Sequence, residues 1–236
     1  MEQQVLTANE SSYRNAGRAA IASGVIGIVA YGFLRTAVSE RTTWIPPTRI
    51  YILFGAHDIA VALQFLLLIS VALGLKKLSH QTPPSISKAA FTTGVGAIVL
   101  TALLSLLGVG NKVLSNGFYM FPQGIFGVWL IVINWRLSGL RPRWLRWFGM
   151  IVGSGLALVG IAFVGIAFVY PSMLAIPAVP QENIVEQNTL TNNISHHILY
   201  VGSYMGVATL PIWTILTGLK LLREKRLDEH ATLQKL

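Results

Sequence analysis

The sequence predicts an all-α, polytopic membrane protein with six transmembrane helices and both termini in the cytoplasm (N-in/C-in). Composition indicates the class, because 53% of the 236 residues are hydrophobic and only 11% are charged, whereas soluble domains carry about 25% charged residues. Several apolar runs also reach the length of about 20 residues that a bilayer-spanning helix needs. The distribution of the basic residues predicts the orientation.

Each apolar run predicts one helix of a single transmembrane bundle that takes up residues 1–236. The first helix is interpreted as retained, because residues 1–15 are polar and lack the basic start of a cleaved signal peptide. Pro211 predicts a kink in the last helix. The predicted helices cover residues 16–38, 50–75, 89–110, 122–137, 147–170 and 196–222.

Lysine and arginine gather on one side of the predicted bundle. Of the 18 basic residues, fourteen fall in the N-terminal segment, the loops after the second and fourth helices, and the C-terminal end. Cytoplasmic loops of membrane proteins carry such an excess. This topology, with contact to anionic headgroups, accounts for the net charge of +9. We therefore expect the lipid bilayer, and no nucleic acid, as a partner.

Two glycine pairs predict close helix packing. Gly149 and Gly153, and likewise Gly202 and Gly206, are four residues apart, which places both glycines of a pair on one helix face. Packing inside the bundle is favoured over a dimer interface.

Several classes of chemistry lack their sequence signals. The chain has no cysteine, which excludes disulfides, zinc–thiolate and iron–sulfur sites and cysteine nucleophiles. The Asp-rich motifs for a diphosphate with Mg²⁺ and the Gly-rich phosphate loops are also missing. No metal site is predicted, and the absence of an evident internal repeat disfavours a transporter.

The second predicted helix carries polar residues that need a reason. His57, Asp58 and Gln64 interrupt the apolar run 50–75, and a carboxylate in hydrocarbon costs roughly 2.5–3.5 kcal/mol on insertion scales. Counted from Arg49, His57 and Asp58 lie roughly 12–13 Å along the helix, in its outer half. His57 and Gln64 share one face, and Asp58 is turned about 100° from it.

Other polar residues are expected at a similar depth. If the second and last helices are neighbours, these residues and the polar residues of the second helix form an outward-facing cleft. The candidate ligand-binding residues are Arg35, His57, Asp58, Gln64, Gln123, His196, His197, Tyr200 and Tyr204.

Three interpretations of this set remain open. In the structural one, Asp58 pairs with Arg35 or His57. In the second, the cleft binds a ligand or a cofactor, since neutral histidine is a good axial ligand for haem or a chlorin. In the third, Asp58 and His57 are catalytic or proton-carrying groups of a membrane-embedded enzyme, of the cyclase or isomerase type, or of a proton-coupled carrier. The identity of any cofactor is unknown.

The turn between the fourth and fifth helices carries a family resemblance. Pro142-Arg-Trp-Leu145, followed by Trp147-Phe-Gly-Met-Ile-Val-Gly153, resembles a bacterial family of small polytopic membrane proteins with a domain of unknown function. The resemblance covers roughly 40 residues around helices 4–5. It implies six helices and placement in the bacterial inner membrane, and it carries over no site residues.

The functional expectation is an integral membrane protein whose outward polar cleft binds a small hydrophobic ligand or another membrane subunit. The enzyme or carrier that uses Asp58 with His57 is the alternative, and whether the chain is an enzyme is left open. An immunity or export factor would use the same architecture.

Overall fold

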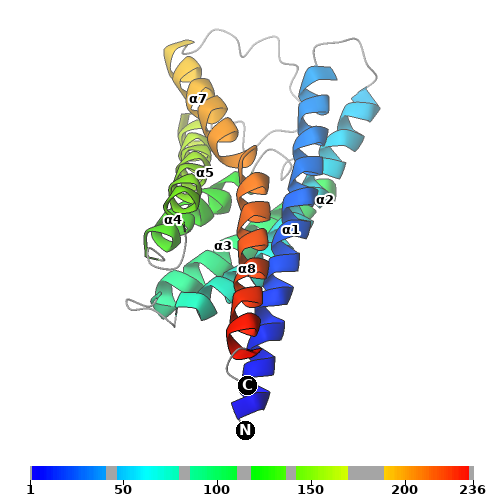
Figure 1. Cartoon of the computed structure of the whole chain (residues 1–236). Coiled ribbons are helices and arrows are strands. Elements are labelled where there is room, and N and C mark those ends of the chain that lie inside the picture. The colour runs from blue at the N-terminus through cyan, green and yellow to red at the C-terminus, as the bar shows by residue number, and fades with distance from the viewer. Residues whose placement is uncertain are drawn as a thin grey trace.

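The computed structural model describes residues 2–40, 47–79, 86–110, 118–136, 142–169 and 189–233. Within these ranges all regular structure is helical and no strand is present, which confirms the all-α prediction there. Figure 1 shows the helices, which are α1 (Glu2–Glu40), α2 (Pro47–Ser79), α3 (Lys88–Gly110), α4 (Met120–Arg136), α5 (Arg143–Val169), α7 (Thr189–Gly202), the π-helix η3 (Ser203–Val207) and α8 (Leu210–Leu233).

Five helical segments of the described chain are long and apolar enough to cross a membrane, which indicates a membrane protein. They are Tyr13–Ser39, Thr48–Lys77, Lys88–Val109, Arg143–Gly165 and His197–Arg223. The predicted helix at 122–137 corresponds to α4, which has 17 residues. At about 1.5 Å per residue α4 is about 25 Å long, shorter than a hydrocarbon core of about 30 Å.

The helices pack in a series that follows the chain. Helix α1 lies between α2 and α8, and from α2 the packing continues through α3 and α4 to α5. The α7–η3 segment then packs on the other side of α5. The first turn of α1 and the last turn of α8 lie at the same end of the bundle (Figure 1).

Glycines allow α5 to approach its neighbours closely. A Cβ atom on Gly127 of α4 would lie 2.5 Å from the Gly153 carbonyl oxygen of α5. On the other side of α5, a Cβ atom on Gly206 of η3 would lie 2.4 Å from the Leu156 nitrogen. Only glycine fits where backbones meet so closely. The expected packing of Gly153 and Gly206 inside the bundle is confirmed.

The last predicted helix is interrupted rather than simply bent. The five residues of η3 form a π-helical turn, in which the Ala208 N–H donates to the Ser203 carbonyl at 2.9 Å. The Thr209 hydroxyl donates to the Met205 carbonyl, and α8 then begins at Leu210, directly before Pro211. Proline lacks an N–H and cannot continue the ladder of a preceding helix, so the interruption lies beside the predicted kink.

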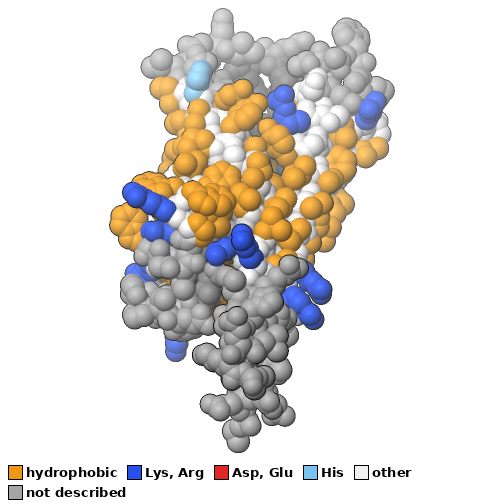
Figure 2. Space-filling view, viewed as in Figure 1, with side chains coloured by type: hydrophobic (Ala, Val, Ile, Leu, Met, Phe, Trp, Pro, Cys, Tyr) orange, Lys and Arg blue, Asp and Glu red, His pale blue; other side chains and the backbone are white. Residues whose placement is uncertain are grey.

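The outer surface of the bundle is apolar around its middle. Figure 2 shows a broad area of hydrophobic side chains with lysine and arginine side chains above and below it. Exposed aliphatic side chains also lie on α3, where Leu103 and Leu107 are about half exposed. Such a surface is suited to lipid and not to water.

Candidate functional site

His57 is a buried residue held between two neighbouring elements. Its side chain is 2% exposed. Nδ1 lies 2.9 Å from the Ala30 carbonyl oxygen of α1, and Nε2 lies 3.2 Å from the Tyr119 hydroxyl. A carbonyl oxygen can only accept, so Nδ1 carries the proton and donates to Ala30. In the neutral ring Nε2 is then the acceptor of the Tyr119 O–H.

Tyr119 completes this pair from the turn that precedes α4. Its side chain is buried, and its ring centroid lies 6.4 Å from that of His57. The Gln123 N–H donates to the Tyr119 carbonyl at 3.1 Å, which joins the turn to the first turn of α4. Tyr119 was not among the site residues predicted from the sequence. A tyrosine at the end of a loop is typical of the membrane interface, and no sequence signal shows that its ring turns inward.

Asp58 is buried beside this pair and is 4% exposed. Its carboxyl group interacts electrostatically with the Tyr119 hydroxyl. In the part of the chain that the structure describes, Asp58 has no ion pair with a lysine or arginine. Both ring nitrogens of His57 have other partners. The structural interpretation, in which Asp58 pairs with His57 or Arg35, therefore finds no support among these residues.

Two further buried polar side chains, Gln123 and Gln64, lie on α4 and α2. Gln123 is 4% exposed, and it follows Tyr119 by one turn on α4. Gln64 is 5% exposed and lies two turns deeper on α2. A Cβ atom on Gly27 of α1 would lie 2.5 Å from the Gln64 Nε2 and 2.7 Å from Pro211 of α8. Gln64 therefore faces the junction of α1 with α8.

A second group of polar residues lies between α1 and the α7–η3 segment. The rings of Tyr200 and Tyr204 are 4.7 Å apart, and the Tyr204 hydroxyl is hydrogen-bonded with those of Tyr200 and Tyr31. Arg35 acts on the same hydroxyls electrostatically. Tyr200 is 63% exposed and Tyr204 is 42% exposed. This group is therefore at the surface.

The structure does not bring the predicted site residues into one cleft. Because α1 lies between α2 and α8, α2 is not a packing neighbour of α7. His57 and Asp58 are enclosed, whereas Tyr200, Tyr204 and Arg35 are exposed. His197 is exposed as well, and the side chain of His196 lies outside the described residues. We name the enclosed group His57, Asp58 and Tyr119 the buried cluster.

The buried cluster presents no free histidine nitrogen for axial ligation. Binding of a haem or chlorin iron or magnesium at His57 would require Nδ1 to leave Ala30 or Nε2 to leave Tyr119. Among the residues that were searched, no group of three or more His, Cys, Asp or Glu side chains could hold a metal ion. The geometry around His57 is that of a closed pair of hydrogen bonds.

Comparison with known proteins found no matching family model, no matching curated protein and no matching solved structure. The resemblance to a bacterial membrane-protein family stays a prediction from residues 142–153.

Proposed function

We propose that the chain is a multi-pass protein of the bacterial inner membrane with six crossings and both termini in the cytoplasm. Five crossings are the candidate spans and α4 is the sixth. Two observations support an even number. The beginning of α1 and the end of α8 lie at one end of the bundle (Figure 1), and α4 packs along α5 through Gly127 and Gly153. The excess of lysine and arginine supports the cytoplasmic orientation.

The function that we propose is binding of a small cationic ligand at Asp58, within the buried cluster. The observation that carries this proposal is the burial of the Asp58 carboxyl group. Its side chain is 4% exposed, it lies within a candidate span, and it has no basic partner among the described residues. A buried carboxylate is unfavourable unless a proton or a cation compensates its charge. Tyr119 and His57 then supply a rigid polar wall, because each holds the other in place.

A proton-coupled carrier is the second candidate, and the interrupted helix favours it. Transporters commonly place interrupted helices beside a site in the membrane interior. Here η3 and Pro211 interrupt the span His197–Arg223, and Pro211 approaches Gly27 on α1, the helix whose Ala30 carbonyl holds His57. In that function Asp58 exchanges a proton for the cation. Among the side chains that the structure describes, Asp58 is the only carboxylate, so these residues offer no second acid in support of the enzyme alternative.

The test is a thermal-stability screen of the detergent-purified protein with Na⁺, ammonium, methylammonium and tetramethylammonium as probes. A ligand at a hundred times its Kd stabilises the folded state by about 2.7 kcal/mol, so at least one probe should raise the melting temperature. We expect Asp58→Asn to remove the shift and Asp228→Asn, near the C-terminus, to retain it. Equal shifts in wild type and Asp58→Asn, or no shift with any probe, would contradict cation binding.

The same variants separate simple binding from carriage. Proteoliposomes that enclose a pH-sensitive dye should show proton movement driven by a gradient of the bound cation if the protein is a carrier. Binding without proton movement retains the first function and eliminates the second. Asp58→Asn serves as the inactive control for both measurements.

A further inference from the structure

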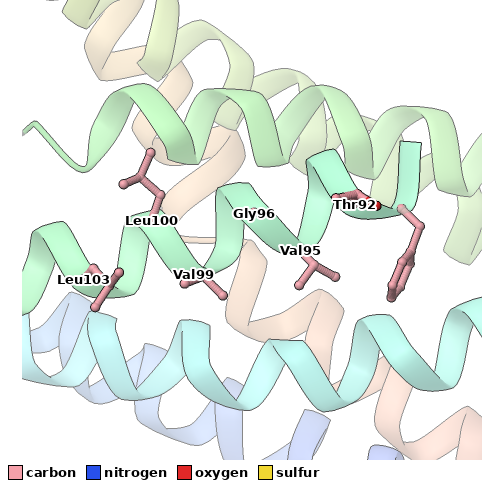
Figure 3. Close-up of a pocket in the computed structure, with 7 residues that line it drawn as sticks. Thr92, Val95, Gly96, Val99, Leu100 and Leu103 are labelled. Atoms are coloured by element: carbon pink, nitrogen blue, oxygen red, sulfur yellow. The ribbon is translucent and has the colours of Figure 1, made fainter. Parts of the chain in front are cut away.

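An apolar groove runs along the outer face of α3, and no residue of the buried cluster lines it. It has a volume of about 400 Å³ and is lined by seven residues of α3 alone, from Phe91 to Leu103. Figure 3 shows Thr92, Val95, Gly96 and Val99 following one another along the helix. Gly96 forms the open floor, because a Cβ atom at this position would meet no atom within 4 Å.

The length of the groove matches one leaflet of a bilayer. Phe91 and Leu103 are twelve residues apart, which is roughly 18 Å along a helix axis. Half of a hydrocarbon core is about 15 Å thick. An acyl chain that begins at the Phe91 end would therefore extend to about the bilayer midplane beside Leu103.

The two ends of the groove differ in charge. The Lys76 ammonium group, in the last turn of α2, lies 4.1 Å from the centroid of the Phe91 ring. Lys88 begins α3 and is exposed, three and four residues before Phe91 and Thr92, so it shares their helix face. At the Leu103 end the lining is leucine and valine. One end is thus cationic and the other apolar, which is complementary to the anionic head and apolar tail of an anionic lipid.

We propose that this groove binds an anionic phospholipid, with one acyl chain along Gly96 and the phosphate between Lys76 and Lys88. Basic groups at the cytoplasmic end of transmembrane helices are typical sites for anionic headgroups. With the proposed topology the lipid belongs to the cytoplasmic leaflet. The site is independent of the ligand at Asp58, so each proposal can fail without the other.

The experiment is native mass spectrometry of the protein purified in mixed micelles with equal phosphatidylglycerol and phosphatidylcholine of identical acyl chains. We expect adducts of phosphatidylglycerol to survive preferentially. Lys76→Gln should weaken their retention by about fivefold, the effect of one basic residue near a membrane surface. Gly96→Phe should fill the groove and eliminate the preference.

Two matched controls separate the site from general effects of charge and size. Lys77→Gln removes the same charge from the neighbouring lysine, which lies 5.7 Å from the Tyr13 ring instead, and it should retain the lipid. Gly165→Phe adds the same ring to α5 at another glycine with open space around its Cβ position, and it should also retain the lipid. If Gly96→Phe does not fold, the difference in phosphatidylglycerol retention between Lys76→Gln and Lys77→Gln still tests the site.

Three results would overturn the proposal. Equal retention of the two lipids would mean that the groove contacts annular lipid without selecting an anionic headgroup. Unchanged phosphatidylglycerol binding in Gly96→Phe would place the lipid elsewhere. A dimer that Gly96→Phe dissociates would identify a second copy of the chain as the occupant, since Thr92 and Gly96 also have the spacing of helix-packing motifs.

Discussion

The α4–α5 interface and the α1–α2 interface join neighbouring helices by different means. Between α4 and α5 the contact is backbone on backbone, as at Gly127 and Gly153. Between α1 and α2 it includes polar bonds, since His57 donates to Ala30 and the Ser23 hydroxyl donates to the Gln64 carbonyl at 3.0 Å. A steric interface has one arrangement, whereas hydrogen bonds can exchange partners. The chemistry of the protein is therefore expected at α1–α2, with α4–α5 as its rigid support.

The largest effect should come from the steric interface. Gly127→Val would drive its side chain into the Gly153 carbonyl and the Ala157 nitrogen. Because backbone cannot move aside as a side chain can, we expect a loss of roughly 3 kcal/mol or more in unfolding free energy. Unfolding in mixed micelles with increasing sodium dodecyl sulfate measures it. Gly165→Val, where the space is open, is the control, and equal midpoints for the two variants would refute the comparison.

His57→Ala should have the next largest effect, roughly 2–3 kcal/mol, because it removes two hydrogen bonds and leaves the Tyr119 hydroxyl and the Ala30 carbonyl buried without their partner. The same unfolding assay measures the loss. His197→Ala, at an exposed position, should change little. A His57→Ala protein as stable as wild type would mean that the polar bonds at α1–α2 contribute no stability.

Asp58→Asn should act in the opposite direction. Burial removes water from the Asp58 carboxylate, which is unfavourable for the folded state, and no basic partner in the described residues offsets this cost. The neutral isostere asparagine should therefore raise the unfolding free energy by about 1 kcal/mol. Measurement at neutral pH without added cations isolates this term. A destabilisation of similar size would show that the Asp58 charge is part of the structure and that its role is not primarily binding.

The smallest effect is expected at the exposed tyrosines. A double-mutant cycle of Tyr200→Phe and Tyr204→Phe should give a coupling energy of about 0.6 kcal/mol, the average for polar contacts between membrane helices. Both hydroxyls are at the surface, where lipid headgroups or water can replace the lost bond. A coupling comparable with the His57→Ala loss would move this group into the functional core of the protein.

The sequence predicts where the apolar helices of this fold lie in the chain, but it does not predict which helices pack against one another. Apolar runs predicted 50–75 and 89–110, and the structure has Pro47–Ser79 and Lys88–Gly110. Hydropathy measures transfer into lipid, so it locates the apolar part of a helix and misses a polar extension. The first helix, predicted from residue 16, begins at Glu2, and the last, predicted to end at residue 222, ends at Leu233. Hydropathy is silent on which helix lies beside which. That information is in side-chain fit, such as Gly27 admitting Gln64, and it becomes visible only in three dimensions.

The candidate site shows the same limit. His57, Asp58, Gln64 and Gln123 could be selected because polar groups in apolar runs are costly, and all four are buried. Tyr119 could not be selected from the sequence, because a tyrosine at that position is equally suited to be an interfacial anchor. Tyr200 and Tyr204 were grouped with His57 on the assumption that their helices adjoin, and α1 separates them.

The π-helical turn also sets the rotational phase of everything that follows it. Each residue of an α-helix advances the side-chain direction by about 100°. Deleting one residue from Ser203–Val207 would remove the extra residue of the π turn and would rotate α8 by about that angle. Trp213, Thr214 and Thr217, all at most 1% exposed, would then rotate out of the bundle. Related sequences should therefore tolerate substitutions in this turn far more readily than a change in its length.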